Sequence, residues 1–206
     1  LSSSAFAQKK LTTTFASNNG GSSGWTCYND IRVTNEQGIS IVGFEINTNA
    51  TATTVGTPVT VEFYTCPTTY IGNEANIGAW TLQSTMTGPG QLRNTPTPLS
   101  LPTPVALPAG SYGVAPWASG LGPPYTGTSS SGPRATSANS DITLVTGMVK
   151  STKFLSTGST FTPRTWNGSI VYNVQANSST LRPFGAGCTG TNGAPSLDQA
   201  TGSWPK

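Results

Sequence analysis

The chain has 206 residues, of which only 8% are charged, and it contains no histidine. Ten basic and seven acidic residues give a formal charge of +3. The lack of histidine excludes Ser–His–Asp and Cys–His catalytic sites and histidine-based zinc sites, because each needs an imidazole. Apart from two short groupings the basic residues are scattered, which does not indicate a nucleic-acid partner. No apolar run approaches about eighteen residues, so we expect no membrane span.

The N-terminal residues resemble the end of a secretory signal. Ala5, Phe6 and Ala7 match the small-x-small pattern that signal peptidase recognises. We therefore expect a secreted protein, extracellular or at the cell surface, with residues 1–10 as an exported arm or residual signal segment. The side chains that follow alternate as in a strand, and we interpret them as an assembly strand that adds to a neighbouring subunit's sheet. These assembly residues are Leu11, Thr13 and Phe15.

Short alternating runs separated by Gly, Pro, Asn and Ser clusters continue along the chain, and no helical period persists. The expected strands are Leu11–Ala16, Trp25–Thr34, Ile39–Asn47, Pro58–Cys66, Trp80–Thr87, Thr103–Leu107, Ser111–Ala118, Ile142–Met148 and Ser169–Gln175. About nine strands predict an all-β fold, an antiparallel two-sheet β-sandwich or jelly roll, over residues 11–176. Residues 177–206 read as a Gly/Ser/Thr-rich tail or linker.

Alternation also predicts which side chains form the core. The core-facing residues expected in the strand from 58 to 66 are Val59, Val61 and Phe63. Those expected to share a face in the strand from 39 to 47 are Val42, Phe44 and Ile46. Prolines in Thr87–Pro104 interrupt ladder hydrogen bonds, so this stretch should be an edge or an extended connection. Ser119–Ser140 is rich in Gly, Ser and Pro and reads as a long surface loop.

Three cysteines in an exported chain usually give one disulfide and one remaining thiol. Cys27 and Cys66 lie in strands expected to be adjacent and are the candidates for the disulfide. Alternation places them on opposite faces, so the bond would need a bulge that reorients one of them, and both states stay open. Cys188 is the odd cysteine and a candidate for an intermolecular link.

We expect no enzyme. A two-carboxylate glycosidase is the only credible catalytic alternative, and Glu45 and Glu62 on neighbouring expected strands are its best pair. No spacing marks them as a pair, so ordinary strand-face carboxylates are the favoured interpretation. A Ser/Lys dyad within Lys150–Lys153 is disfavoured, because lysines in a polar turn are usually solvated. Gly185–Gly190 spells G-x-G-x-x-G but lacks the flanking strand and helix, so no cofactor is expected.

Tryptophan faces can stack on sugar rings. Trp25 and Trp80 lie in strand patterns and are expected in the core. Trp117 and Trp204 are the better candidates for exposure and for contact with a ligand, which would be a glycan.

Four segments carry a likeness to a known family, and a fifth resembles a linker between modules. The four are Thr14–Gly21, Gly78–Trp80, Pro108–Gly113 and Pro163–Gly168, and the fifth is Phe184–Thr191. They resemble secreted β-sandwich domains of uncharacterised bacterial surface proteins, especially the planctomycete type, over about residues 10–175. The resemblance implies export and a sandwich fold, and it supplies no catalytic residue.

These observations favour a non-enzymatic structural subunit of an extracellular fibre or surface assembly. It would form a homo-oligomer or polymer, packed through polar sandwich faces and ordered ends. The alternative is a secreted carbohydrate-binding or adhesion module.

Overall fold

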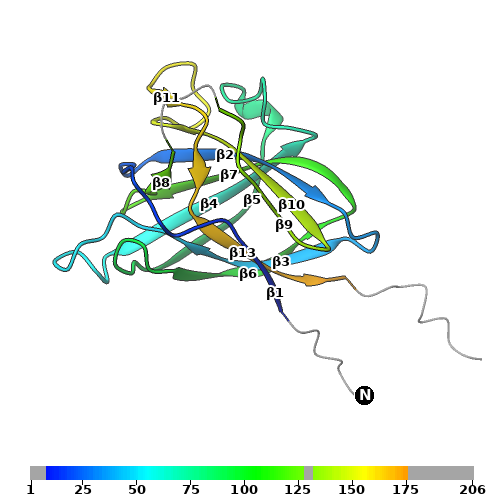
Figure 1. Cartoon of the computed structure of the whole chain (residues 1–206), viewed down its shortest axis with the longest axis horizontal. Coiled ribbons are helices and arrows are strands. Elements are labelled where there is room, and N and C mark those ends of the chain that lie inside the picture. Colours follow the sequence, from blue (N-terminus) through cyan, green and yellow to red (C-terminus); the bar gives the residue numbers. More distant parts are fainter. Residues whose placement is uncertain (1–7, 128–131, 176–206) are drawn as a thin grey trace, which may run out of the picture. The chain divides into compact units, whose positions relative to one another are not determined.

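The computed structural model describes residues 8–127 and 132–175, all within the unit Leu1–Gln175. Apart from the 3-10 turn Ile77–Ala79, its regular elements are strands. They are β1 (Lys9–Thr12), β2 (Trp25–Val33), β3 (Ile39–Ile46), β4 (Pro58–Pro67), β5 (Thr81–Pro89), β6 (Thr97–Leu107), β7 (Gly110–Ser119), β8 (Tyr125–Thr126), β9 (Thr136–Ala138), β10 (Ile142–Lys150), β11 (Thr160–Phe161), β12 (Thr165–Trp166) and β13 (Gly168–Val174) (Figure 1).

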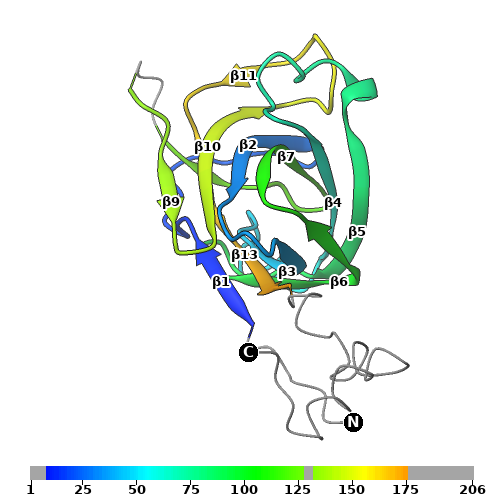
Figure 2. The same cartoon turned by 90° about the vertical axis from the view of Figure 1, so that its right-hand side faces the viewer.

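Two antiparallel sheets enclose one core. The four-stranded sheet has the order β1-β13-β3-β6, and the seven-stranded sheet has the order β11-β10-β2-β7-β4-β5 with β9 on β10. Seen end-on, the smaller sheet closes one side of the core and β10, β2, β7 and β4 close the other (Figure 2). The prediction of an all-β antiparallel sandwich is confirmed, with short extra strands beyond the nine expected.

Strand β4 shows how alternation builds this core. Val59, Val61 and Phe63 are at most 1% exposed and pack between the sheets, as predicted. Glu62 lies between them in the chain and on the opposite face, where it is half-buried. Burying the apolar set contributes about 1.5–3 kcal/mol for each side chain, which fixes the register, because a slip of one residue would place Glu62 in the core.

A bulge in β3 makes the predicted shared face of Val42, Phe44 and Ile46 wrong at Val42. The register with β6 shifts between Ile41 and Gly43, so Val42 faces outward and is only half-buried. Ile41 and Phe44 both face the core, although strict alternation would place them on opposite faces. Gly43 permits the close approach, because a Cβ there would lie 2.7 Å from the Leu99 carbonyl oxygen.

A second apolar layer covers the outer face of the seven-stranded sheet. Its buried side chains are Tyr28, Tyr64, Cys66, Tyr70, Trp80, Ala115 and Phe154. They come from β2, β4 and β7 and from two connections, residues 68–80 and 151–159. Trp80 is buried as expected, but in this outer layer rather than between the sheets, and its indole N–H donates to the Asn73 carbonyl at 2.8 Å. Trp25, also expected in the core, is half-buried and packs against the core between the two sheets.

The proline-rich and Gly/Ser-rich segments give mixed outcomes. The edge prediction for residues 87–104 is confirmed, because β5 and β6, which carry most of this stretch, are edge strands of their sheets. The prediction of a surface loop from Ser119 is wrong for its first part, since Leu121 and Tyr125 are buried in the main core. Gly122 explains the fit: a Cβ there would lie 2.1 Å from the Gly21 carbonyl oxygen, so two backbones cross in contact where only glycine fits.

Candidate functional site

The N-terminal strand lies in the chain's own sheet. β1 pairs with β13, from Lys9 opposite Tyr172 to Thr12 opposite Ser169, and stands at the edge of the four-stranded sheet. The strand expected to reach Ala16 ends at Thr12, because the partner strand begins at Gly168. Leu11 is 5% exposed in the core.

The other two predicted assembly residues lie beyond the ladder. Thr13 donates its hydroxyl to the Trp166 carbonyl at 2.6 Å. Phe15 is half-buried in the following connection. The three residues therefore do not form one alternating strand, and Leu11, the member that lies within β1, already has a place in its own sheet.

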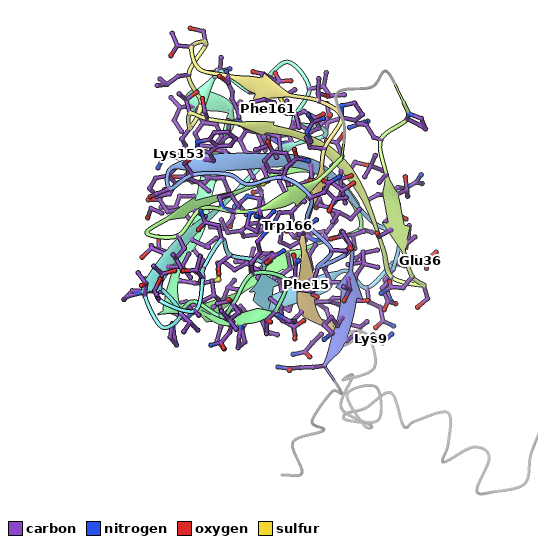
Figure 3. The ribbon with its side chains drawn as sticks, turned by 60° about the vertical axis from the view of Figure 1, so that its left-hand side comes forward. Lys9, Phe15, Glu36, Lys153, Phe161 and Trp166 are labelled. Atoms are coloured by element: carbon purple, nitrogen blue, oxygen red, sulfur yellow. The ribbon has the colours of Figure 1, made fainter. Side chains whose placement is uncertain are left out.

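Two lysines of β1 form ion pairs with residues outside this strand. Lys9 Nζ lies 2.8 Å from a carboxylate oxygen of Asp141, whose side chain is 4% exposed, and Lys10 pairs with Glu45 at 3.0 Å on the surface. Asp141 also accepts hydrogen bonds from Asn35 at 2.9 Å and from the Tyr172 hydroxyl at 3.0 Å. Figure 3 shows Lys9 beside the start of the chain's described part.

The surroundings of the Asp141 carboxyl group favour its ionised form. Burial alone would raise the pKa of its carboxyl group, but hydrogen bonds from Lys9, Asn35 and Tyr172 outweigh burial and hold the pKa below its ordinary value. Burial and the bond to Asp141 raise the pKa of Tyr172 to about 12. Asp141 therefore stays ionised at neutral pH and links the first, tenth and last strands.

A second polar cluster lies on the outer face of the seven-stranded sheet. In Figure 3 its Lys153 is labelled on the side of the view opposite to Lys9. Lys153 belongs to the connection between β10 and β11, and its Nζ lies 2.6 Å from a carboxylate oxygen of Glu62. The same Nζ lies 4.0 Å from the ring centre of Trp117 and 5.4 Å from that of Tyr64. We call Glu62, Tyr64 and Trp117 the sheet cage.

The pKa values in this cluster follow from mutual hydrogen bonds. Burial would raise the pKa of Glu62, but hydrogen bonds from Lys153 and Tyr64 lower it below its ordinary value. Burial would lower the pKa of Lys153, but its bonds with Glu62 and Tyr64 raise it. Burial and the bond to Glu62 raise the pKa of Tyr64. At neutral pH the cluster therefore holds a carboxylate, an ammonium and a neutral phenol.

The structure separates the glycosidase pair. Glu45 lies in β3 of the four-stranded sheet and Glu62 in β4 of the seven-stranded sheet, each on a face away from the shared core. They are not on neighbouring strands, and each has its own lysine partner. A mechanism that needs two carboxylates across one glycosidic bond is not built from them.

The residues of the Ser/Lys alternative bond to other partners and not to each other. Lys150 is 5% exposed, and its ammonium donates to the Leu155 carbonyl. The Ser151 hydroxyl oxygen accepts a hydrogen bond from the Ser159 amide at 2.8 Å. Lys153 is engaged by the sheet cage. These bonds close the turn and commit both lysine amines to partners other than Ser151.

The disulfide between Cys27 and Cys66 is not formed, and the structure gives the reason. β7 lies between β2 and β4, so the two strands are not adjacent. Cys27 points into the core between the sheets, whereas Cys66 belongs to the outer aromatic layer. Both are buried free thiols, and burial raises the pKa of Cys27 to about 12 and that of Cys66 to about 11.

We expect alkylation of the denatured, unreduced chain to label both Cys27 and Cys66, with slow labelling of either in the native state because a buried thiol forms little thiolate. Peptide mass spectrometry measures this. A peptide pair joined through these two cysteines would contradict the structure.

Two predicted positions lie outside the described residues: Cys188, the candidate for an intermolecular link, and Trp204, a candidate ligand contact. The glycine-rich segment 185–190 also lies there. Trp117 is described and half-buried, with its indole N–H fixed to the Gly24 carbonyl at 2.8 Å. Sequence reasoning did not identify Tyr64 and Lys153 as neighbours of Trp117. The available signal for Tyr64 was its position two residues after Glu62, which places both side chains on the same face of the strand.

Within residues 8–127 and 132–175, no helix has the length and apolar character needed to cross a bilayer. Over the same ranges, no group of three or more acidic or cysteine side chains is placed to hold a metal ion. Searches against protein-family models and curated proteins find no match. The resemblance to planctomycete-type surface domains therefore stays a prediction.

Proposed function

We propose that the protein is a non-enzymatic structural subunit of an extracellular fibre or surface assembly, joined by exchange of β1 between copies. The observation that carries the proposal is the position of β1, a four-residue strand at the edge of the four-stranded sheet, next to β13. Removing β1 from its own sheet uncovers the edge of β13. An incoming β1 from a second copy fits that edge with the same register and the same side-chain partners.

The energetics support exchange. Leu11 is the one β1 side chain buried in the core, so release of the strand exposes little apolar surface. The ion pairs of Lys9 with Asp141 and of Lys10 with Glu45 break when β1 leaves, and both form again when a neighbour supplies its own strand. The net free energy is then set by the connection after Thr12 and by the interface between the subunits. The sparsely charged surface, with 8% charged residues in the chain, gives weak repulsion between copies.

The glycan-binding alternative has less support from the geometry. Trp117 is half-buried, and the Lys153 ammonium sits over its ring at 4.0 Å, where a sugar would have to stack. This alternative stays a prediction.

A disulfide trap tests the exchange. Thr12 and Ser169 are register partners with their hydroxyl oxygens 2.9 Å apart, which places the pair within disulfide reach after Thr12→Cys and Ser169→Cys. In a Cys188→Ser background, oxidation of assembled material should give covalent dimers and longer ladders on non-reducing gels. Oxidation of dilute monomer should instead lock β1 in its own sheet and abolish assembly, as measured by light scattering.

The parent Cys188→Ser chain, carried through the same steps, should assemble with and without prior oxidation and should show no ladder. If assemblies of the double variant contain only internally bonded monomers after oxidation, β1 is not exchanged. If the locked monomer still assembles, the joint lies elsewhere in the molecule.

A further inference from the structure

The three members of the sheet cage come from two neighbouring strands. Glu62 of β4 and Trp117 of β7 are direct register partners, and Tyr64 lies two residues further along β4 on the same face. The cage therefore belongs to two interior strands of the seven-stranded sheet. The cation inside it, Lys153, belongs to a connection between strands. A rigid receptor part and a tethered cation are thus supplied by different elements.

The cage has the chemistry that recognises an ammonium ion. The faces of Trp and Tyr rings attract a cation within about 6 Å of the ring centre, and a carboxylate supplies the opposite charge. The Lys153 Nζ lies 4.0 Å from the centre of the Trp117 ring and 2.6 Å from a carboxylate oxygen of Glu62, and it donates to the Tyr64 hydroxyl oxygen at 3.3 Å. Without Lys153 the cage would carry one negative charge, the face of the Trp117 ring and the hydroxyl group of Tyr64.

The cage is held in place without the lysine. The Trp117 indole N–H donates to the Gly24 carbonyl at 2.8 Å, and the Tyr64 hydroxyl donates to Glu62. The Tyr64 ring also packs edge-on against Phe154, with centres 4.9 Å apart. Such fixed surroundings favour ligand binding, because little ordering is left to occur on association.

The connection is anchored independently of Lys153. Phe154 is 3% exposed in the aromatic layer, and its backbone N–H donates to the Tyr28 hydroxyl at 3.1 Å. Lys153 itself has a side chain that is 29% exposed, and Glu62 is 22% exposed. A cation from solvent can therefore reach the cage, and the lysine can leave it, while the connection stays in place.

We propose that Glu62, Tyr64 and Trp117 form a binding site for small alkylammonium ions, occupied by Lys153 from the same chain. Lys153 acts as a tethered competitor, so an external ligand binds with an affinity reduced by the fraction of time that the lysine fills the cage. A quaternary ammonium suits the site, since its methyl groups can contact the face of the Trp117 ring and it sheds its hydration more easily than a primary ammonium.

The test is a titration of Lys153→Ala with tetramethylammonium chloride, followed by the Trp117 indole N–H signal in a nitrogen-15 correlation spectrum. The signal is assigned with Trp117→Phe. We expect a saturable shift in Lys153→Ala and binding about tenfold weaker in the wild type. Adding Glu62→Gln to Lys153→Ala should weaken binding about tenfold again, because the carboxylate is lost.

Lys10→Ala is the matched control, because Lys10 also pairs with a glutamate at 3.0 Å but does so on the four-stranded sheet, away from the sheet cage. This variant should bind no better than wild type, and sodium chloride at equal ionic strength should give no saturable shift. A natively folded Lys153→Ala without saturable binding overturns the proposal, as does equal binding in Lys153→Ala and its double variant with Glu62→Gln. If Lys153→Ala does not fold, Lys153→Thr takes its place with the same expectations.

Discussion

Phe154→Ala is expected to destabilise the domain by about 3–5 kcal/mol, the range for deleting a buried phenylalanine ring. Phe154 is 3% exposed and lies at the centre of the outer aromatic layer. Its ring centre is 4.9 Å from that of Tyr64, 5.0 Å from Trp80 and 5.9 Å from Tyr28. Removing it leaves a cavity among large rigid rings that cannot collapse easily, and the connection that carries Lys153 loses its anchor. Urea unfolding followed by circular dichroism measures the loss.

The neighbouring residue supplies the control. Leu155 is 54% exposed, so Leu155→Ala should change the free energy of unfolding by no more than about 0.5 kcal/mol. The Leu155 carbonyl that accepts from Lys150 is kept in this variant. If Phe154→Ala had an effect as small as that of Leu155→Ala, the outer layer would contribute little to stability and the connection would pack only loosely against the sheet.

The strands were predictable because their signal is local. Val59, Val61 and Phe63 occupy the core as period-two alternation requires. The same rule failed in β3, where the bulge beside Val42 adds one residue and reverses the phase of the pattern. Nothing in the local sequence marks that extra residue except Gly43, whose role depends on Leu99 in another strand. Alternation therefore predicts faces only between irregularities.

The candidate sites were less predictable because they depend on strand order. Glu45 and Glu62 look adjacent when strands are assumed to pair in sequence, and the strands of Cys27 and Cys66 were also expected to be adjacent. The crossovers instead place β7 between β2 and β4 and move β3 to the other sheet. Glu62, Trp117 and Lys153 were each noticed for separate reasons, and only the β4–β7 register and the path of the connection after β10 bring them together.

The outer aromatic layer was missed for a related reason. A strand pattern assumes one buried face and one solvated face, whereas β4 buries Phe63 between the sheets and Tyr64 beneath the connections. A single tyrosine on the outer face of each of β2 and β4, followed by aromatic residues in the long connections, is the signal that could have indicated it.

Asp141→Asn should lower stability at neutral pH by about 2–3 kcal/mol, the range for losing charge-assisted hydrogen bonds to a buried group. The carboxylate is 4% exposed and accepts from Lys9, Asn35 and Tyr172. An amide can accept through only one oxygen, so at least one of these donors loses its partner. Because Lys9 belongs to β1, the effect should be largest on the four-stranded sheet, and β1 amides should exchange with deuterium faster.

The pH dependence separates charge from packing in this network. The pKa of Asp141 in the folded chain lies below its ordinary value near 3.8, so the unfolded chain takes up the proton first as the solution is acidified. The stabilisation is fully present above that ordinary value and is lost as pH falls through the lower, folded pKa. Urea unfolding from about pH 7 to about pH 2 should therefore show wild type and Asp141→Asn converging in acid.

Glu45→Gln is the surface comparison, since it breaks the exposed pair made by Lys10 of the same strand. It should cost no more than about 1 kcal/mol at neutral pH. Parallel pH curves for wild type and Asp141→Asn would contradict an ionised anchor and assign its effect to packing alone. Convergence would make acid the condition that loosens β1 from its own sheet, because only the ionised Asp141 holds Lys9. Acidification below the folded pKa of Asp141, followed by neutralisation, should then speed the proposed strand exchange between copies. The Thr12/Ser169 cysteine trap would record this as a faster build-up of covalent ladders.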